Sequence, residues 1–512
     1  MLSWPPRSKQ QPPVLRGTIP YVSNTVQYMT NAGAFLDRVS NQLKETKSNI
    51  IKFHVGFTPA YIVTGSPEVL DVNFLMLRMM EAHWGVSPAE LGQVPAPGTE
   101  HTPDDQRYWH GHDRLYVDYL TNRKYSDALA ETFYRLFSER LDRQPVAEWT
   151  TVNLFQFLKA TMAESAVISL FGSQIVDLNP GIIEAYWDFD AIAGPLAWGL
   201  PQLSAAPVAL AIEARLHEMT RRHIDSAWEH FDWDGPDAEA TWDPHWGSRL
   251  SRESARWLRQ GGFSNHAAAG HTLATLFGLN GNTVPITTWA MIEAIKDPSL
   301  FQALREEAQS AYTATDPKTG TKHIDAQKLV ALPLMQSLYV ETMRLHVSLN
   351  IARQAKQPLE IDGFRVRQGA LVQTCSQVAH YDEAVWAAGG HPATEFWGWR
   401  HVKEVEVVDE GSGETVTRRQ FAMKARPSSF FSVWYVFPRG GYVMCPGRHF
   451  AKQEILLAVA VLVSKFDMEF VEWTNPDDGS RSDRPGLDDR RYAAFLAMSP
   501  DREMKIRWRR NW

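Results

Sequence analysis

The 512-residue chain has only two cysteines, Cys375 and Cys445, so it can form at most one disulfide bond. This count excludes a disulfide scaffold and favours a reducing compartment. The chain also lacks an excess of basic residues, because 52 lysines and arginines face 59 aspartates and glutamates and the net charge is −7. We therefore expect no nucleic-acid partner, since nucleic-acid binding needs a basic surface.

Long apolar runs are scarce as well. The longest run near the C-terminus, from Ile455 to Val463, has nine residues, whereas a bilayer span needs roughly 20, so the run predicts a buried helix. The start of the chain, MLSWPPRSKQQPP, is rich in proline and has no apolar segment of the signal-peptide type. Such a stretch commonly follows a membrane anchor as a stiff spacer. We expect the cytosolic face of the endoplasmic reticulum membrane if an anchor was removed, and a cytoplasmic protein otherwise.

The pattern of apolar residues predicts a mainly α-helical, globular protein. Hydrophobic residues make up 44% of the chain, helical spacing dominates residues 107–231 and 264–297, and short β-rich pieces occur near residues 49–63 and 359–436. Because no linker divides these parts, we expect a proline-rich segment over residues 1–30 and a single domain over residues 31–512. The stretch FDWDGPDAEATWDPHWGSR predicts an exposed loop, and TNPDDGSRSDRPGLDDRR predicts a loop between the last helix and a C-terminal strand pair.

Cys445 lies in the segment FPRGGYVMCPGRHF, after a glycine-containing turn and directly before a strongly apolar helix. A thiolate at this position gains backbone N–H donors and the positive end of the helix dipole, which should lower its pKa and suit it to bind a metal or act as a nucleophile. Gly441 and Gly447 would let the backbone approach a flat ligand closely. The alternative is that Cys445 is an inert core residue, the commonest fate of a free cysteine.

This segment resembles the haem-ligand motif of the cytochrome P450 family, an aromatic residue and a glycine turn followed by Cys-x-Gly-Arg. Cys445, Gly447 and Arg448 match the motif and Gly441 stands at its glycine, but Val443 replaces the usual basic residue. The resemblance implies the cytochrome P450 fold, a triangular helical domain with a small β-rich region. It also implies haem b (heme b) as cofactor, with its iron bound axially by Cys445.

A second resemblance is in LPLMQSLYVETMRLH, where Glu341 and Arg344 are spaced i, i+3 and so share one helix face. Alone this spacing means little, because surface ion pairs of this kind are common. It is similar to the family's Glu-x-x-Arg helix, whose pair is joined by an arginine from a later segment. In HPATEFWGWRHV that arginine is Arg400, although Gly398 replaces the family's usual proline.

Three basic residues match positions where the family holds the haem propionates. Arg353 follows the Glu-x-x-Arg helix at the expected distance, and His110 and Arg114 are spaced i, i+4 on one predicted helix face. For His110, a partly buried histidine bonded to backbone is an equally good interpretation. A metal site formed by His110, His112 and Asp113 is a third, but residues at i and i+2 do not face each other on a helix.

The longest predicted helix contains FGLNGNTVPITTW, in which Gly281 and Asn282 stand where most oxygen-activating members of the family have an acid and an alcohol. This resembles the branch of prostacyclin synthase and the cholesterol and oxysterol hydroxylases. We take Gly281, Asn282 and Thr283 as the candidate catalytic residues. Pro285 cannot donate an N–H to the carbonyl of Gly281, so we expect a kink that opens a groove there, although core packing could also fill it.

Taken together, the resemblance implies an enzyme, a haem-thiolate monooxygenase. It would insert oxygen from O2 into a lipophilic small molecule such as a terpenoid, steroid or polyketide in secondary metabolism, with electrons from NADPH through NADPH-cytochrome P450 reductase. The protein supplies position and polarity, and the cofactor carries the oxidation chemistry. The alternative is a haem-thiolate isomerase or dehydratase that rearranges a peroxide without a reductase. A haem protein that only binds a ligand is a third interpretation.

Overall fold

The computed structural model describes residues 11–19, 21–63, 86–87, 90, 114–197, 206–313, 323–355, 357–408, 414–423, 445, 447–494 and 496–512. The helices are α1 (Ser23–Thr30), α2 (Ala32–Thr46), η2 (Val117–Thr121), α6 (Arg123–Leu141), α7 (Leu154–Phe171), α8 (Gln174–Leu178), α9 (Ile182–Ala197), α10 (Ala206–His230), η3 (Pro236–Glu239), α11 (Arg249–Gln260), α12 (Asn265–Lys296), α13 (Pro298–Ser310), α14 (Ala326–Leu329), α15 (Pro333–His346), α16 (Ser376–His380), α17 (Glu383–Trp386), α19 (Arg448–Lys465) and η4 (Arg490–Tyr492). The predicted mainly α class is confirmed.

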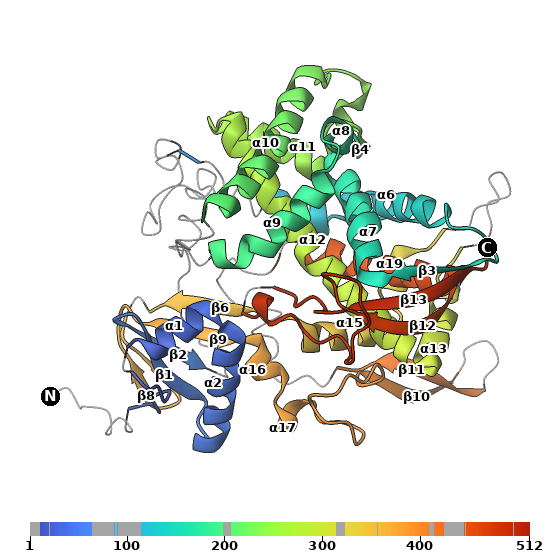
Figure 1. Ribbon diagram of the computed structural model, residues 1–512. Helices are drawn as coiled ribbons and strands as arrows, with labels where there is room; N and C mark the ends of the chain where they lie inside the picture. The colour runs from blue at the N-terminus through green and yellow to red at the C-terminus, as the bar shows by residue number, and fades with distance from the viewer. Residues whose placement is uncertain are drawn as a thin grey trace.

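The strands form small, separate sheets. They are β1 (Ile50–Val55), β2 (Thr58–Val63), β3 (Trp149–Asn153), β4 (Trp242–Asp243), β5 (Gly247–Ser248), β6 (Asn350–Gln354), β7 (Leu359–Ile361), β8 (Phe364–Val366), β9 (Leu371–Cys375), β10 (Val402–Val408), β11 (Thr415–Phe421), β12 (Phe466–Thr474) and β13 (Glu503–Arg510). The largest sheet has the order β1-β2-β9-β6, in which only the β2-β9 pair is parallel. Figure 1 shows this sheet beside α1 and α2 at one end of the molecule, with the large helices at the other.

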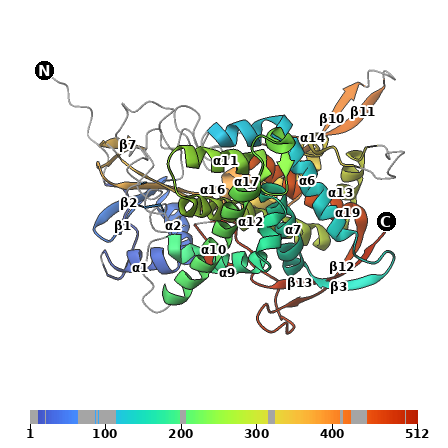
Figure 2. The ribbon, with the colours of Figure 1, turned by 90° about the horizontal axis from the view of Figure 1, so that it is seen from above.

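The N-terminal part of the chain packs against this sheet. Leu15 is buried, its backbone N–H donates to the carbonyl of Lys52, and α1 contacts both α2 and β1. The predicted β-rich piece near residues 49–63 is confirmed by β1 and β2, which pair as an antiparallel hairpin. At the opposite end, the β10-β11 hairpin projects beyond the helices, as Figure 2 shows from above.

Helix α12 runs through the centre of the helical part and contacts α7, α10, α15 and α19. It begins after Ser264, whose hydroxyl accepts a hydrogen bond from the N–H of Ala267, and it ends at Asp297. The Asp297 side chain caps α13 by accepting from the N–H groups of Ser299 and Leu300. The α-helix continues past Pro285 to Lys296, so the predicted kink does not end it.

Helix α19 is buried along almost its whole length, from Gln453 to Lys465, as the run Ile455 to Val463 predicted. Among the described residues, one helix is long and apolar enough to cross a membrane by length and composition, and it is α7. Most of α7 is nevertheless buried in the protein core, where it packs against α6 and α12. A core helix passes the same test, so α7 is weak support for a membrane span.

Two local predictions were wrong. The tryptophan-rich stretch after α10 is not an exposed loop, because Trp246 and Asp243 are buried and the guanidinium of Arg252 binds the Asp243 carboxylate at 3.0 Å. The charged loop near residue 480 does not follow α19 directly. It joins β12 to β13, and these strands form a three-stranded sheet with β3, since β13 pairs with both. In the first place contacts with distant residues bury a stretch of polar composition, and in the second the strand β12 stands between α19 and the loop.

Candidate functional site

Cys445 stands just before α19, as the motif predicts, and Gly447 is the N-cap residue of that helix. The residue is exposed, and both cysteines of the chain are free. The N–H of Arg448 donates to the Cys445 carbonyl at 3.3 Å, and so does its guanidinium at 3.1 Å. The loop is therefore closed onto the first turn of α19, and the sulfur lies next to the end of the helix that carries positive partial charge.

The net direction of the Cys445 pKa differs from the prediction. Although the residue itself is exposed, desolvation by nearby protein atoms raises the pKa of the thiol, while the N–H groups of Gly447 and Arg448 and the charge of Arg448 lower it. The predicted N–H donors are thus present, but the effect of desolvation on the pKa is larger than theirs. A thiol in such surroundings needs a cation to hold it as the thiolate, and a coordinated metal deprotonates a thiol in this way.

The donor chemistry of this site fits haem. Haem iron in cytochromes P450 takes one protein thiolate as an axial ligand, and a single soft sulfur at an exposed helix start can serve in that way. Among the described residues, no group of three or more histidine, cysteine, aspartate or glutamate side chains could hold a metal ion. A closed metal centre of the structural zinc type is therefore not found in the described part of the chain.

The predicted trio of Glu341, Arg344 and Arg400 is confirmed, and all three side chains are buried. Arg344 donates to both carboxylate oxygens of Glu341, at 2.9 and 2.8 Å, and Arg400 Nε donates to Oε1 at 2.7 Å. The remaining guanidinium N–H groups donate to main-chain carbonyls; their acceptors are His380, Trp386, His391, Pro392, Ala393 and Glu395. The trio thus fastens α15 to the segment after α17.

Opposing effects act on the pKa of Glu341. Burial alone would raise it, but the guanidinium groups of Arg344 and Arg400 and the nearby imidazole of His401 lower it well below the usual range. Glu341 is therefore ionised throughout the working pH range. Because two arginines balance its charge, we infer that Glu341 has a structural role and takes no part in proton transfer.

The candidate catalytic residues Gly281, Asn282 and Thr283 all lie on α12, but they face different neighbours. The side-chain oxygen of half-buried Asn282 accepts a hydrogen bond from the N–H of Ala497 at 3.0 Å. The buried Thr283 hydroxyl donates to the carbonyl of Leu279 at 2.7 Å and to the Glu454 carboxyl group on α19 at 3.2 Å. Asn282 thus faces the C-terminal segment, and Thr283 faces α19.

Gly281 faces a buried polar cluster that the sequence did not predict, formed by Asp190 and Tyr186 of α9 and Tyr492 of η4. Asp190 is 5% exposed, and it accepts hydrogen bonds from the Tyr492 hydroxyl at 2.9 Å and the Tyr186 hydroxyl at 3.4 Å. A Cβ atom at position 281 would lie 3.3 Å from both Asp190 Oδ1 and the Tyr186 hydroxyl. The sequence gives little indication of this cluster, because Asp190 is one of three acids on α9, with Glu184 and Asp188.

The remaining predicted residues are only partly described. Arg114 is exposed and lies 3.6 Å from Asp118 in an i, i+4 ion pair. Arg353 lies on β6, where its backbone pairs with Val372 of β9, and its side chain is outside what the structure describes. His110 and Gly441 lie outside the described residues. The predicted propionate contacts therefore remain predictions.

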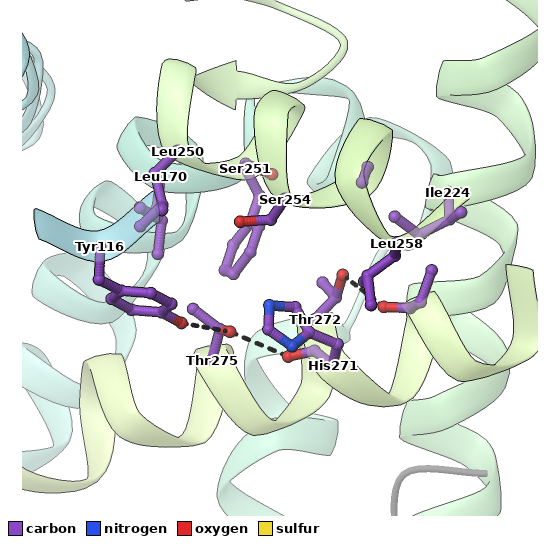
Figure 3. A pocket seen from close by; sticks show the side chains of 13 residues that line it. Tyr116, Leu170, Ile224, Leu250, Ser251, Ser254, Leu258, His271, Thr272 and Thr275 are labelled. Atoms are coloured by element: carbon purple, nitrogen blue, oxygen red, sulfur yellow. Dashed lines mark hydrogen bonds between the residues drawn. The ribbon is translucent and has the colours of Figure 1, made fainter. Parts of the chain in front are cut away.

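A second polar region borders the N-terminal half of α12, where a small cavity lies among α7, α10, α11 and the residues before η2 (Figure 3). The Tyr116 hydroxyl is 3.1 Å from the Thr275 hydroxyl, which donates to the carbonyl of His271 at 2.9 Å. The room for water-sized molecules is about 20 Å³, enough for one water. This cavity is too small for an organic substrate.

Comparison with known proteins agrees with these features. The family model described as Cytochrome P450 matches residues 248–389, which include α12 and the Glu341 pair. The chain is 42% identical over 528 aligned residues to cytochrome P450 monooxygenase calL of Penicillium decumbens, covering 99% of this chain and 95% of that protein. It is 26% identical to cytochrome P450 monooxygenase fsoE of Humicola fuscoatra, covering 93% of this chain and 85% of that protein.

A more distant relative carries a substrate in its name. The chain is 24% identical to the 25-hydroxycholesterol 7-alpha-hydroxylase of Rattus norvegicus, covering 69% of this chain and 80% of that protein. This similarity agrees with the resemblance of the Gly281–Asn282 stretch to the oxysterol hydroxylases. The near full-length identity to a monooxygenase, together with the buried Glu341 trio and the Cys445 loop, leads to one conclusion: the chain belongs to the cytochrome P450 family.

Proposed function

We propose that this protein is a monooxygenase that inserts one oxygen atom of O2 into a lipophilic terpenoid, steroid or polyketide, with NADPH-derived electrons. The observation that carries the proposal is the 42% identity to a cytochrome P450 monooxygenase over nearly the whole of both chains. The steroid class is supported by the similarity to the 25-hydroxycholesterol 7-alpha-hydroxylase. The fungal relatives support a place in secondary metabolism.

In this proposal Cys445 holds the haem iron from the start of α19. The haem would supply the oxidation chemistry when bound, and the Cys445 thiolate would be its protein ligand. The N–H groups of Gly447 and Arg448 stabilise negative charge on the sulfur, since both lower the pKa of the thiol. The Glu341 trio keeps α15 fixed against the segment at residues 393–401, and α12 forms the opposite wall beside Gly281 and Asn282.

The electron donor in this proposal is NADPH-cytochrome P450 reductase, and the location is the cytosolic face of the endoplasmic reticulum membrane if the natural chain carries an anchor, and the cytoplasm otherwise. Arg448 and Lys452, close to Cys445 on α19, are cations of the kind that an acidic electron-transfer partner would contact. Lys452 is half-buried, and desolvation lowers its pKa to about 8, so it is still mostly protonated at pH 7. Electron transfer should therefore weaken as salt concentration rises.

The test is NADPH-dependent product formation by the haem-loaded protein with the reductase under oxygen-18 gas. A panel of steroids, triterpenoids and polyketides supplies the substrate. We expect one labelled oxygen atom in the product. Turnover of a hydroperoxide without reductase or label would instead favour the isomerase alternative and overturn the proposal.

The Cys445 assignment has its own test. Cys445→Ser should abolish the thiolate-type absorption of the reduced carbon monoxide complex, because a serine hydroxyl is a much weaker donor than a thiolate. Cys375→Ser is the matched control, since Cys375 is buried on β9, where burial raises the pKa of its thiol to about 11. The control should keep the absorption, and its loss in the control alone would contradict the assignment.

A further inference from the structure

Gly281 of α12 has buried neighbours from two other segments of the chain. Glycine has no side chain, so α12 carries no acid at the position where most oxygen-activating relatives have one. In the structure a carboxyl group nevertheless occupies the space beside this glycine. Asp190 Oδ1, from α9, lies 3.3 Å from the point where a Cβ atom of residue 281 would stand. This oxygen therefore lies in the region that an acidic side chain at position 281 would occupy.

Packing fixes the Asp190 carboxyl group in this place. The side chain is 5% exposed and Tyr186 is fully buried beside it. Its Oδ2 atom accepts from the Tyr492 hydroxyl at 2.9 Å and its Oδ1 atom accepts from the Tyr186 hydroxyl at 3.4 Å. Leu496 covers Gly281 from the same segment as Tyr492, with a methyl carbon 3.5 Å from the same Cβ point.

The charged groups around Asp190 come from α7 and η4. Lys159 of α7 and Arg491 of η4 both attract the carboxylate, and both lower its pKa. Among the described ion pairs, neither Lys159 nor Arg491 pairs with Asp190. Arg491 pairs instead with Asp489, at 2.6 Å. Burial is the stronger effect and raises the pKa of Asp190 to about 6. The neutral and ionised forms are thus both accessible near neutral pH.

We propose that Asp190 supplies from α9 the acid that α12 lacks at position 281, and that it delivers protons to the oxygen chemistry beside Gly281 and Asn282. This inference rests on the proposed function. Monooxygenation places one oxygen atom of O2 in the substrate and releases the other as water, with two electrons from the reductase and two protons. Asp190 gives up a proton toward the α12 side. It then regains one from solvent through the hydroxyl of half-buried Tyr492, which accepts a proton as it passes one on.

Without this relay, reduced oxygen leaves as hydrogen peroxide, so the structure predicts uncoupling. Asp190→Asn keeps the size of the side chain but cannot release a proton. We expect product per NADPH to fall by roughly tenfold or more, with hydrogen peroxide accounting for the missing oxygen. The matched control is Glu503→Gln, because burial also raises the pKa of Glu503, to about 7, but its carboxylate accepts from the N–H of Phe155 at the start of α7. The control should stay coupled.

A direct spectroscopic readout is independent of turnover. In the haem-loaded full-length protein, infrared difference spectra between pH 5 and pH 8 should show a protonated carboxyl group that titrates near pH 6. The band should vanish in Asp190→Asn and persist in Glu503→Gln. Tyr492→Phe removes the donor to Oδ2 and should shift the titration upward, since that hydrogen bond lowers the pKa of Asp190.

Moving the carboxyl group from α9 to α12 tests whether the loss of coupling comes from the missing acid or from disturbed packing. Asp190→Ala clears the space beside position 281, and Gly281→Asp then returns a carboxyl group to it from α12. We expect the double variant to regain most of the coupling that Asp190→Ala loses. Coupling that stays intact in Asp190→Asn, while the wild type forms labelled product, overturns this inference alone. A wild type that forms no labelled product overturns the proposed function instead, and the infrared titration still reports whether Asp190 holds a proton there.

Discussion

Two buried carboxyl groups in this protein differ in what surrounds them. Glu341 is completely buried, and two guanidinium groups donate to it directly. Asp190 is almost as buried, but its donors are the neutral hydroxyls of Tyr492 and Tyr186. The pKa of Glu341 falls well below its usual range, whereas that of Asp190 rises to about 6.

The difference shows that the charge of the hydrogen-bond partners, and not burial alone, decides the protonation state of a buried acid. The two arginines compensate the charge of Glu341, so this carboxylate can fasten α15 to a distant loop at every working pH. Hydroxyl donors compensate the charge of Asp190 only in part, so this acid can bind and release a proton. The charge of the hydrogen-bond donors thus distinguishes a buried carboxyl group with a structural role from one that can transfer protons.

The largest expected effect comes from breaking the compensated site. Glu341→Gln removes the negative charge between Arg344 and Arg400 and leaves two guanidinium groups buried without a counter-ion. We expect the free energy of unfolding to fall by about 3 to 5 kcal/mol, measured by urea denaturation at pH 7. The control is Glu139→Gln, which breaks the half-exposed ion pair with Arg135. It should cost less than about 1 kcal/mol, and equal losses in the two variants would contradict the comparison.

The next effect tests the uncompensated site through its pH dependence. The ordinary pKa of aspartate is 3.8 and that of folded Asp190 is about 6, so the folded state binds this proton more tightly than the unfolded state does. Its contribution to stability is complete below about pH 4 and is lost as the pH rises through 6. Asp190→Asn, which does not titrate, should therefore be more stable than the wild type by about 3 kcal/mol at pH 8 and by roughly half of that at pH 5.

Urea denaturation of both proteins from pH 5 to pH 8 measures this difference. A gap that does not grow with pH would show that Asp190 is ionised throughout the range. Glu341 should show the opposite sign: its contribution is present above the ordinary pKa of 4.5 and is lost only as the pH falls toward its lower folded value. Stability between pH 5 and pH 8 should thus carry no slope from Glu341.

The smallest expected effect concerns a third buried acid, Glu454, whose hydrogen-bond donor is a hydroxyl, as it is for Asp190. Burial raises the pKa of Glu454 well above its usual range, and the Thr283 hydroxyl is its hydrogen-bond partner. Thr283→Val keeps the shape but removes this hydroxyl, so we expect a loss of about 1 kcal/mol in thermal unfolding experiments. Thr283→Ser should lose less than half of that. A larger loss in Thr283→Ser than in Thr283→Val would mean that packing of the methyl group, which valine keeps, stabilises α12 against α19 more than the hydrogen bond does.

Local patterns of the sequence were enough for the parts of the site that lie close together in the chain. Glu341 and Arg344 share a helix face because they are three residues apart, and Cys445 precedes α19 because an apolar helix follows it at once. Arg400 was found only through resemblance to a family, since nothing in its own segment indicates a partner 59 residues away. The burial of Trp246 was missed because the surrounding residues are polar.

The Asp190 cluster could not be predicted from the chain. Asp190, Gly281 and Tyr492 are separated by roughly a hundred or more residues, and a glycine gives no indication of which side chain will fill the space beside it. The same limit applies to the Cys445 thiol, whose pKa was predicted to fall. The sequence shows the helix start whose N–H groups lower this pKa. It does not show the surrounding atoms, which desolvate the thiol and raise its pKa.

The sequence by itself determined the mainly helical class, the buried α19, the position of Cys445 and the pairing of Glu341 with Arg344, because periodicity and short spacing act within one element. Only the tertiary structure decided which acid stands beside Gly281, which carboxyl groups are compensated, and where the tryptophan-rich stretch packs. Those properties depend on desolvation and on contacts between distant segments, which exist only once α9, α12 and the C-terminal segment have come together.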